Sequence, residues 1–218
     1  MIGTRTLEAI ATMPIVTKQN LGVLLGVSPA TLDYRVQRMQ TTGDLLRLRS
    51  GLYAPTAAWQ AAQSSPGQTR QYLEYLSGIV RAPSYLSLEY VLEKAGMIPE
   101  SPFALTCITT KTPRMYATPL GRFVYRSIRS DLFTGYGLET YRGLEVRIAS
   151  PAKALFDMLY LRPFSTSSAM RSYLLETGRL NWDALRPSEK KRLVTTIHIS
   201  GVPKMKRILS ILTAEGIV

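Results

Sequence analysis

The strongest constraint in this sequence is the order of the segments in residues 15–55. A first helix is predicted after Thr17, whose side chain can cap it, and Gly26 supplies the permissive backbone that a tight turn requires. Ser28 is placed to cap a second helix that begins with Pro29, where the missing N–H group costs nothing. Two short apolar runs separated by Ser-Gly follow and predict a β-hairpin. The segment therefore predicts two short helices joined by a tight turn, followed by a hairpin.

This order is that of a winged helix-turn-helix, in which the second helix enters the major groove of DNA. The second helix is expected to run to about Gln40, with Leu32, Val36 and Met39 on its buried side. Its outer side carries hydroxyl, amide and guanidinium groups, which can reach base edges and phosphates. The predicted DNA-binding residues are Ser28, Thr31, Tyr34, Arg35, Arg38, Arg47 and Arg49.

The hairpin adds two of these cations. Arg47 and Arg49 alternate with Leu46 and Leu48, so one face is expected to pack while the other presents both arginines to a phosphate backbone. The alternative is that these are ordinary solvated side chains on a small helical domain. The ordered combination of caps, turn, polar helix face and basic hairpin favours double-stranded DNA as the partner.

The charge balance also favours a polyanionic partner. The 218 residues include 27 Lys and Arg against 15 Asp and Glu, a net charge of +12 at pH 7. Release of counterions favours the binding of such a chain to nucleic acid. Residues 1–65 hold six cations and three acids, so residues 66–218, with 21 cations and 12 acids, are basic as well. A purely neutral sensor domain is therefore not expected in the second part.

The sequence predicts a cytoplasmic protein that does not enter a membrane. Cys107 is the only cysteine, so no intrachain disulfide can form, and this fits a reducing compartment. The N-terminus lacks the apolar core of a signal peptide. No segment reaches the roughly 20 apolar residues that a membrane span requires.

The chain is expected to divide at a linker of small and polar residues, 61–68, which is broken by Pro and Gly. Residues 1–60 would form the winged helix-turn-helix domain, and residues 69–218 a mixed α+β domain. Few contacts are expected across such a linker. Within the second domain, helices are predicted at 85–95, 151–161, 167–177, 188–199 and 203–214, and strands at 103–109, 122–129 and 144–148. The predicted fold class is therefore α+β, with the C-terminal portion helical.

Three stretches resemble the AbiEi antitoxins of bacterial abortive-infection (type IV) toxin–antitoxin systems. They are GLYAP at 51–55, SYLSLEYVLEKAGMIPE at 84–100 and VRIASPAKALFDMLYLRP at 146–163. The third matches the pattern P-[small]-K-A-L-x-D-x-L-Y-L through Pro151, Lys153, Ala154, Leu155, Asp157, Leu159, Tyr160 and Leu161. The resemblance covers residues 5–165 and includes no catalytic signature.

The resemblance implies a repressor that autoregulates its own toxin–antitoxin operon in phage defence. Its DNA partner would be its own promoter, with inverted repeats as the expected operator. The second domain would counteract a nucleotidyltransferase-like toxin, directly or indirectly. Candidate residues for this antitoxicity are Lys153, Lys190, Lys191 and Arg192. Lys153 and Asp157 can pair across one helical turn. They can belong to a functional surface, or equally they can lie on the solvent side of an ordinary core helix.

Two other functions remain open. One is a plain transcriptional regulator whose second domain senses a ligand or forms a dimer. The other is a metal-dependent nuclease using Asp131 and Glu145 beside Arg147, because phosphodiester hydrolysis needs carboxylates for Mg²⁺ and a cation for the developing charge. The only histidine, His198, lies in an apolar context, and no phosphate-loop or nucleophile motif is present. No catalytic residue, cofactor or metal is therefore expected.

Overall fold

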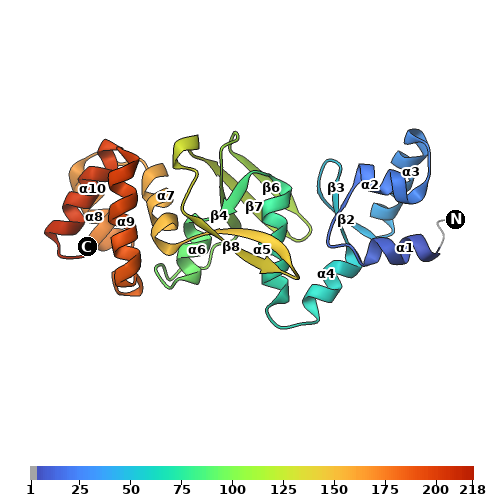
Figure 1. Ribbon diagram of the computed structural model, residues 1–218, viewed down its shortest axis with the longest axis horizontal. Coiled ribbons are helices and arrows are strands. Elements are labelled where there is room, and N and C mark those ends of the chain that lie inside the picture. The colour runs from blue at the N-terminus through green and yellow to red at the C-terminus, as the bar shows by residue number, and fades with distance from the viewer. Residues whose placement is uncertain (1–3) are drawn as a thin grey trace.

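The computed structural model describes residues 4–218, which form ten α-helices and two β-sheets in a mixed α+β arrangement. The elements follow one another along the longest axis of the molecule (Figure 1). A small three-stranded sheet with helices lies at the N-terminal end. A six-stranded sheet occupies the middle, and helices form the C-terminal end.

The N-terminal elements begin where the capping residues predict. The chain opens with α1 (Thr4–Ala11), β1 (Val16–Thr17), α2 (Lys18–Leu25) and α3 (Pro29–Thr41). Thr17 caps α2 by accepting the N–H of Asn20 at 3.1 Å, and Gly26 ends that helix with φ of +57°. Ser28 caps α3 by accepting the N–H of Thr31 at 3.4 Å. The predicted helix, turn and second helix are therefore confirmed, whereas α1 was not predicted.

The predicted hairpin is also present, and its second strand is buried on both faces. Strands β2 (Leu45–Arg49) and β3 (Leu52–Pro55) pair antiparallel, and β1 joins the other edge of β3. Tyr53 packs into a small core beneath α1, α2 and α3. Its neighbours Leu52 and Ala54 pack into the large core of the remaining chain. The hairpin is thus a layer shared by two hydrophobic cores.

A bulge in β2 separates the two arginines of the hairpin. Arg47 pairs with Tyr53 and Arg49 pairs with Leu52, which leaves Leu48 as the extra residue. Because successive residues of a strand face opposite sides, Arg47 lies on the Tyr53 face and Arg49 on the Leu52 face. The prediction that both arginines project from the same face of the hairpin is therefore wrong. Alternation in the sequence could not reveal the added residue.

The predicted linker contains helical structure instead. Residues 61–68 include the end of α4 (Thr56–Gln63) and the start of α5 (Gln68–Val80), with only a short turn between them. Tyr72 on α5 donates its hydroxyl to the Pro14 carbonyl at 2.6 Å, and Arg49 donates Nε–H to the Val80 carbonyl at 2.9 Å. The expectation of few contacts across residues 61–68 is wrong. Small polar residues here form a helix end rather than a flexible connection.

The six-stranded sheet has the order β6-β7-β5-β4-β9-β8. Strands β5 and β7 are parallel, as are β4 and β9, and the other neighbours are antiparallel. The strands are β4 (Ser84–Leu86), β5 (Leu105–Thr109), β6 (Arg114–Thr118), β7 (Gly121–Ser127), β8 (Tyr136–Tyr141) and β9 (Leu144–Ala149). Those at 105–109, 121–127 and 144–149 match the predicted strands, and β4, β6 and β8 were not predicted.

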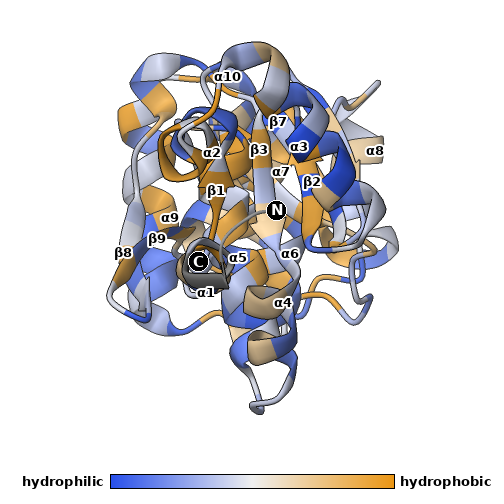
Figure 2. Ribbon diagram, turned by 90° about the vertical axis from the view of Figure 1, so that its right-hand side faces the viewer, coloured by the Kyte–Doolittle hydropathy of each residue, from blue (hydrophilic) through white to orange (hydrophobic). Residues whose placement is uncertain are grey.

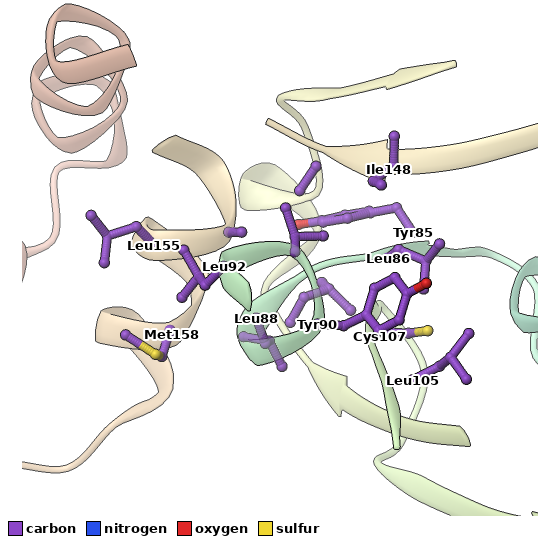
Figure 3. Packing of buried hydrophobic residues seen from close by; sticks show 14 of the residues in the cluster. Tyr85, Leu86, Leu88, Tyr90, Leu92, Leu105, Cys107, Ile148, Leu155 and Met158 are labelled. Atoms are coloured by element: carbon purple, nitrogen blue, oxygen red, sulfur yellow. The ribbon is translucent and has the colours of Figure 1, made fainter. Parts of the chain in front are cut away.

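Helices cover both faces of the sheet. Ser84 donates its hydroxyl to the Ser77 carbonyl of α5, whereas its neighbour Tyr85 donates to Asp157 of α7 (Pro151–Leu161). Helix α6 (Leu88–Lys94) packs beside α7, and Figure 3 shows residues of both helices in the core next to β4 and β5. The predicted helix at 85–95 therefore begins three residues late, because Tyr85 and Leu86 belong to the central strand β4.

The C-terminal end is helical, as predicted. It contains α8 (Ser167–Ser172), a π-helical turn (Tyr173–Thr177), α9 (Pro187–Ser200) and α10 (Pro203–Ala214), and short 3₁₀ turns lie at Ser130–Leu132 and Trp182–Ala184. Helix α7 connects this end to the sheet, because it contacts α9 and α10 as well as β9. Among the described residues, no helix combines the length and apolar character needed to cross a membrane.

A charged pair is buried where α7 meets the sheet. Lys153 Nζ lies 2.5 Å from Asp157 Oδ1, and the two side chains are 2% and 0% exposed. Asp157 also accepts the hydroxyls of Tyr85 at 2.9 Å and Ser87 at 2.8 Å, and Lys153 donates to the Leu132 carbonyl at 2.8 Å. Burial lowers the pKa of Lys153 and raises that of Asp157, and their mutual attraction opposes both shifts. Each buried charge is therefore stabilised by the opposite charge of its partner.

Removing one partner of this pair should strongly destabilise the fold. We expect Lys153→Met to lower the free energy of unfolding by about 3–5 kcal/mol, because it leaves a buried carboxylate without its cation. The double variant Lys153→Met/Asp157→Leu should recover much of that loss. The exposed pair of Arg179 and Glu100 provides the control, since Arg179→Met should cost less than about 1 kcal/mol. Urea unfolding measures all three, and equal costs for the two single variants would contradict this role.

The shared hairpin should couple the unfolding of the two cores. We expect Leu21→Ala to cost about 2–4 kcal/mol, because it opens a cavity in the small core. In a Trp59→Phe background, fluorescence reports Trp182 alone, which packs against the large core. The urea midpoint of Trp182 should fall with Leu21→Ala and stay unchanged with Leu138→Ala, whose side chain is exposed. A Trp182 transition that does not respond to Leu21→Ala would show that the two cores unfold independently.

Candidate nucleic-acid interface

The outer face of α3 is polar and accessible. Leu32, Val36 and Met39 are buried against the small core, as predicted. On the opposite side Thr31 and Arg38 are exposed, and Tyr34 is 65% exposed. Figure 2 looks onto this end of the molecule and shows α3 as largely hydrophilic, beside the apolar strands β1, β2 and β3. The helix therefore presents hydrogen-bonding side chains, not an apolar face, to the solvent.

The N-terminus of α3 is fixed by its cap. The Ser28 hydroxyl accepts the Thr31 N–H and also lies 3.1 Å from the Thr31 hydroxyl. Ser28 therefore positions the start of the helix, and its hydroxyl is already engaged. A helix N-terminus carries partial positive charge, which favours a phosphate nearby.

Three arginines supply free positive charge in this region. Arg38 is exposed and Arg35 partly exposed on α3, and Arg47 is exposed on β2. Among residues 4–218, none of these three guanidinium groups forms an ion pair or a side-chain hydrogen bond within the chain. The acid on the same helix, Asp33, pairs with Lys18 of α2, which limits its repulsion of an anion. Guanidinium groups left without partners can each contact a phosphate oxygen.

Arg49 is placed differently from the prediction. Its Nε–H is bonded to the Val80 carbonyl, and Nη1 donates to the Ser50 carbonyl at 3.2 Å. The side chain therefore ties the hairpin to the end of α5. The bulge in β2 turns it away from the face that carries Arg47. Arg49 is exposed but is held to these two carbonyls, so Arg35, Arg38 and Arg47 are the arginines of this region without a partner among the described residues.

The basic residues assigned to antitoxicity do not form one surface. Lys153 is buried with Asp157, so the expectation that it lies on a solvent-facing side is wrong, because the helix that carries it packs on several sides. Lys190 is partly exposed and Lys191 exposed on α9. Arg192 is exposed and lies 3.1 Å from Glu189, whose other oxygen accepts the Ala152 N–H. Only the α9 residues remain accessible to a partner.

The carboxylates of the nuclease hypothesis are each paired with an arginine. Arg129 makes two hydrogen bonds to Asp131, at 3.1 and 2.7 Å, and holds the pKa of that carboxyl below its usual range. Arg147 lies 2.7 Å from Glu145. Within residues 4–218, no group of three or more His, Cys, Asp or Glu side chains is placed to hold a metal ion. His198 is exposed on α9.

The contacts that hold the buried pair of Lys153 and Asp157 in place could not be predicted from the sequence. Tyr85 and Ser87 hold Asp157 across 72 and 70 residues of chain, and no local spacing signals such a contact.

The lone Cys107 is buried, which raises the pKa of its thiol to about 12. This thiol is therefore unreactive near neutral pH.

The arrangement as a whole can contact a double helix. An α-helix fits the major groove, polar side chains reach base edges, and flanking arginines meet phosphates. When the sequence is compared with models of known protein families and with curated proteins, no match is found.

Proposed function

We propose that this chain is a DNA-binding transcriptional regulator of the winged helix-turn-helix type. Helix α3 would enter the major groove, with Thr31 and Tyr34 contacting bases or sugars and Arg35 and Arg38 contacting phosphates. The hairpin would contribute Arg47. The observation that carries the proposal is the exposed polar face of α3, flanked by arginines that have no partner in residues 4–218.

The arginines provide the direct test. We expect Arg38→Ala and Arg47→Ala each to weaken binding to DNA from the region upstream of the protein's own gene. Each should also lower the slope of log K against log [salt] by about one, because each removes one phosphate contact. Fluorescence anisotropy at several salt concentrations measures both quantities.

The control removes an equal charge from the other end of the molecule. Arg207 is exposed on α10, and Arg207→Ala should leave affinity and slope unchanged. If all three variants weaken DNA binding to the same extent, binding depends on net charge and not on α3. Unchanged affinity and slope in Arg38→Ala and Arg47→Ala would refute the assignment.

The resemblance to AbiEi antitoxins supports a more specific proposal. The chain would repress its own toxin–antitoxin operon in the cytoplasm, through inverted repeats, and counteract a nucleotidyltransferase-like toxin without itself being an enzyme. With Lys153 buried, the accessible basic residues for that second role are Lys190, Lys191 and Arg192 on α9. A toxin gene of this type beside the gene for this chain would support the proposal.

Charge reversal on α9 tests the antitoxin role. We expect Lys190→Glu/Lys191→Glu to reduce the survival of cells that co-express the neighbouring toxin, because it replaces two cations with anions on the accessible face. The matched control is Lys206→Glu/Arg207→Glu on α10, which makes the same change at exposed positions of the next helix. Circular dichroism should confirm that both variants fold. Equal protection by both variants would contradict a role for the α9 surface.

A further inference from the structure

A cavity of about 540 Å³ lies between the start of α5, helix α6 and the turn that joins β6 to β7. Its size is that of sites for small organic ligands. It lies within the larger part of the chain and includes none of the residues assigned to DNA contact. Leu73, Leu105 and Leu120 line it. The cavity therefore offers an apolar surface to a bound molecule.

An aromatic ring at the rim extends this surface. Phe103 lines the cavity and its exposed fraction is 98%, so the phenyl ring makes almost no contact within the chain. Covering an exposed aromatic side chain with an apolar group is favourable, because both surfaces leave water. The apolar body of a ligand would make that contact.

The rim also carries excess positive charge. Arg122 is the second residue of β7, lines the cavity and is exposed, and it has no acidic partner in the described part of the chain. Residues 101–130 contain five cations and no acid, so no carboxylate in that segment can neutralise it. The N–H groups of Thr69 and Arg70, in the first turn of α5, have no acceptor among residues 4–218. Glu93 also lines the cavity and pairs with Arg70, so Arg122 carries the excess positive charge that an anion at this rim would meet.

The wall beside these groups is held in place by buried hydrogen bonds. Tyr90 lines the cavity and donates its hydroxyl to Glu74, which is 3% exposed, at 2.8 Å. Arg70 donates to the Tyr90 hydroxyl at 2.9 Å and pairs with Glu93 at 3.2 Å. Arg70 is thus already engaged, and Arg122 is the cation free to meet a ligand. This wall of the cavity is therefore preformed and needs little ordering when a ligand binds.

We propose that this cavity binds an amphipathic organic anion. The apolar body would lie on the leucines and against Phe103, and a carboxylate, sulfonate or phosphate group would pair with Arg122. The proposal goes beyond DNA binding and does not depend on it. A regulator whose second domain senses a ligand would then sense an organic anion, because Arg122 at the rim favours a negatively charged group.

Two fluorescent probes that share one ring system test both parts of the proposal. 8-Anilinonaphthalene-1-sulfonate carries the anionic group, and N-phenyl-1-naphthylamine lacks it. We expect the sulfonate to bind the full-length folded protein saturably at one site. Arg122→Ala should weaken its binding about two- to fivefold, within the range expected for a solvent-exposed ion pair, and leave the neutral probe unaffected. Phe103→Ala should weaken both probes, because it removes apolar contact.

Arg126→Ala is the matched control. Arg126 lies on the same strand and is exposed, but it does not line the cavity, so its loss should leave both probes unaffected. Circular dichroism of every variant establishes that dye binding reports the folded state. Failure of the sulfonate to bind the wild-type protein would overturn the proposal. Equal weakening by Arg122→Ala and Arg126→Ala would also overturn it, and neither result bears on DNA binding by α3.

Discussion

Burial of strand β3 on both faces joins the small N-terminal core to the large core of the remaining chain. Tyr53 faces the small core beneath α3, whereas Leu52 and Ala54 face the large core. Burying one such leucine stabilises the fold by about 1.5–3 kcal/mol, and breaking the layer would expose apolar surface on both sides. Arg49 adds a hydrogen bond to the end of α5 on the same side as Leu52. As a result α3 has a defined orientation relative to the six-stranded sheet, rather than moving on a flexible linker.

Burial also defines the role of α7, which lies within the stretch on which the proposed likeness to AbiEi antitoxins rests. Its lysine and aspartate form a buried pair, and Tyr85 and Ser87 complete the hydrogen bonds of Asp157. Ser150 caps the helix by accepting the Lys153 N–H. These residues join α7 to the sheet and do not face a partner. The proposed contact with a toxin would therefore use accessible residues, of which Lys191 on α9 is one.

Local signals predicted much of the fold, and long-range packing explains the failures. Caps and glycines located α2, α3 and α7 well, because their hydrogen bonds join residues three or four apart. Tyr85 was placed in a helix, because a three-residue central strand shows little periodicity. The polar face of α3 was predicted from helical spacing alone. The loss of Arg49 and Lys153 from the candidate sites could not be predicted, because it depends on a bulge and on contacts with distant residues.

Locating α3 on DNA tests whether this helix enters the major groove. The single buried thiol of Cys107 is unreactive, so Tyr34→Cys introduces one accessible attachment point for an iron-chelate cleavage reagent. If α3 enters the major groove, cleavage of DNA from upstream of the protein's gene should be strong and confined to a few base pairs within the bound site. The same reagent attached at position 207, on α10, should give no such cleavage. Diffuse cleavage from position 34, or equal patterns from both positions, would contradict insertion of α3 into the major groove.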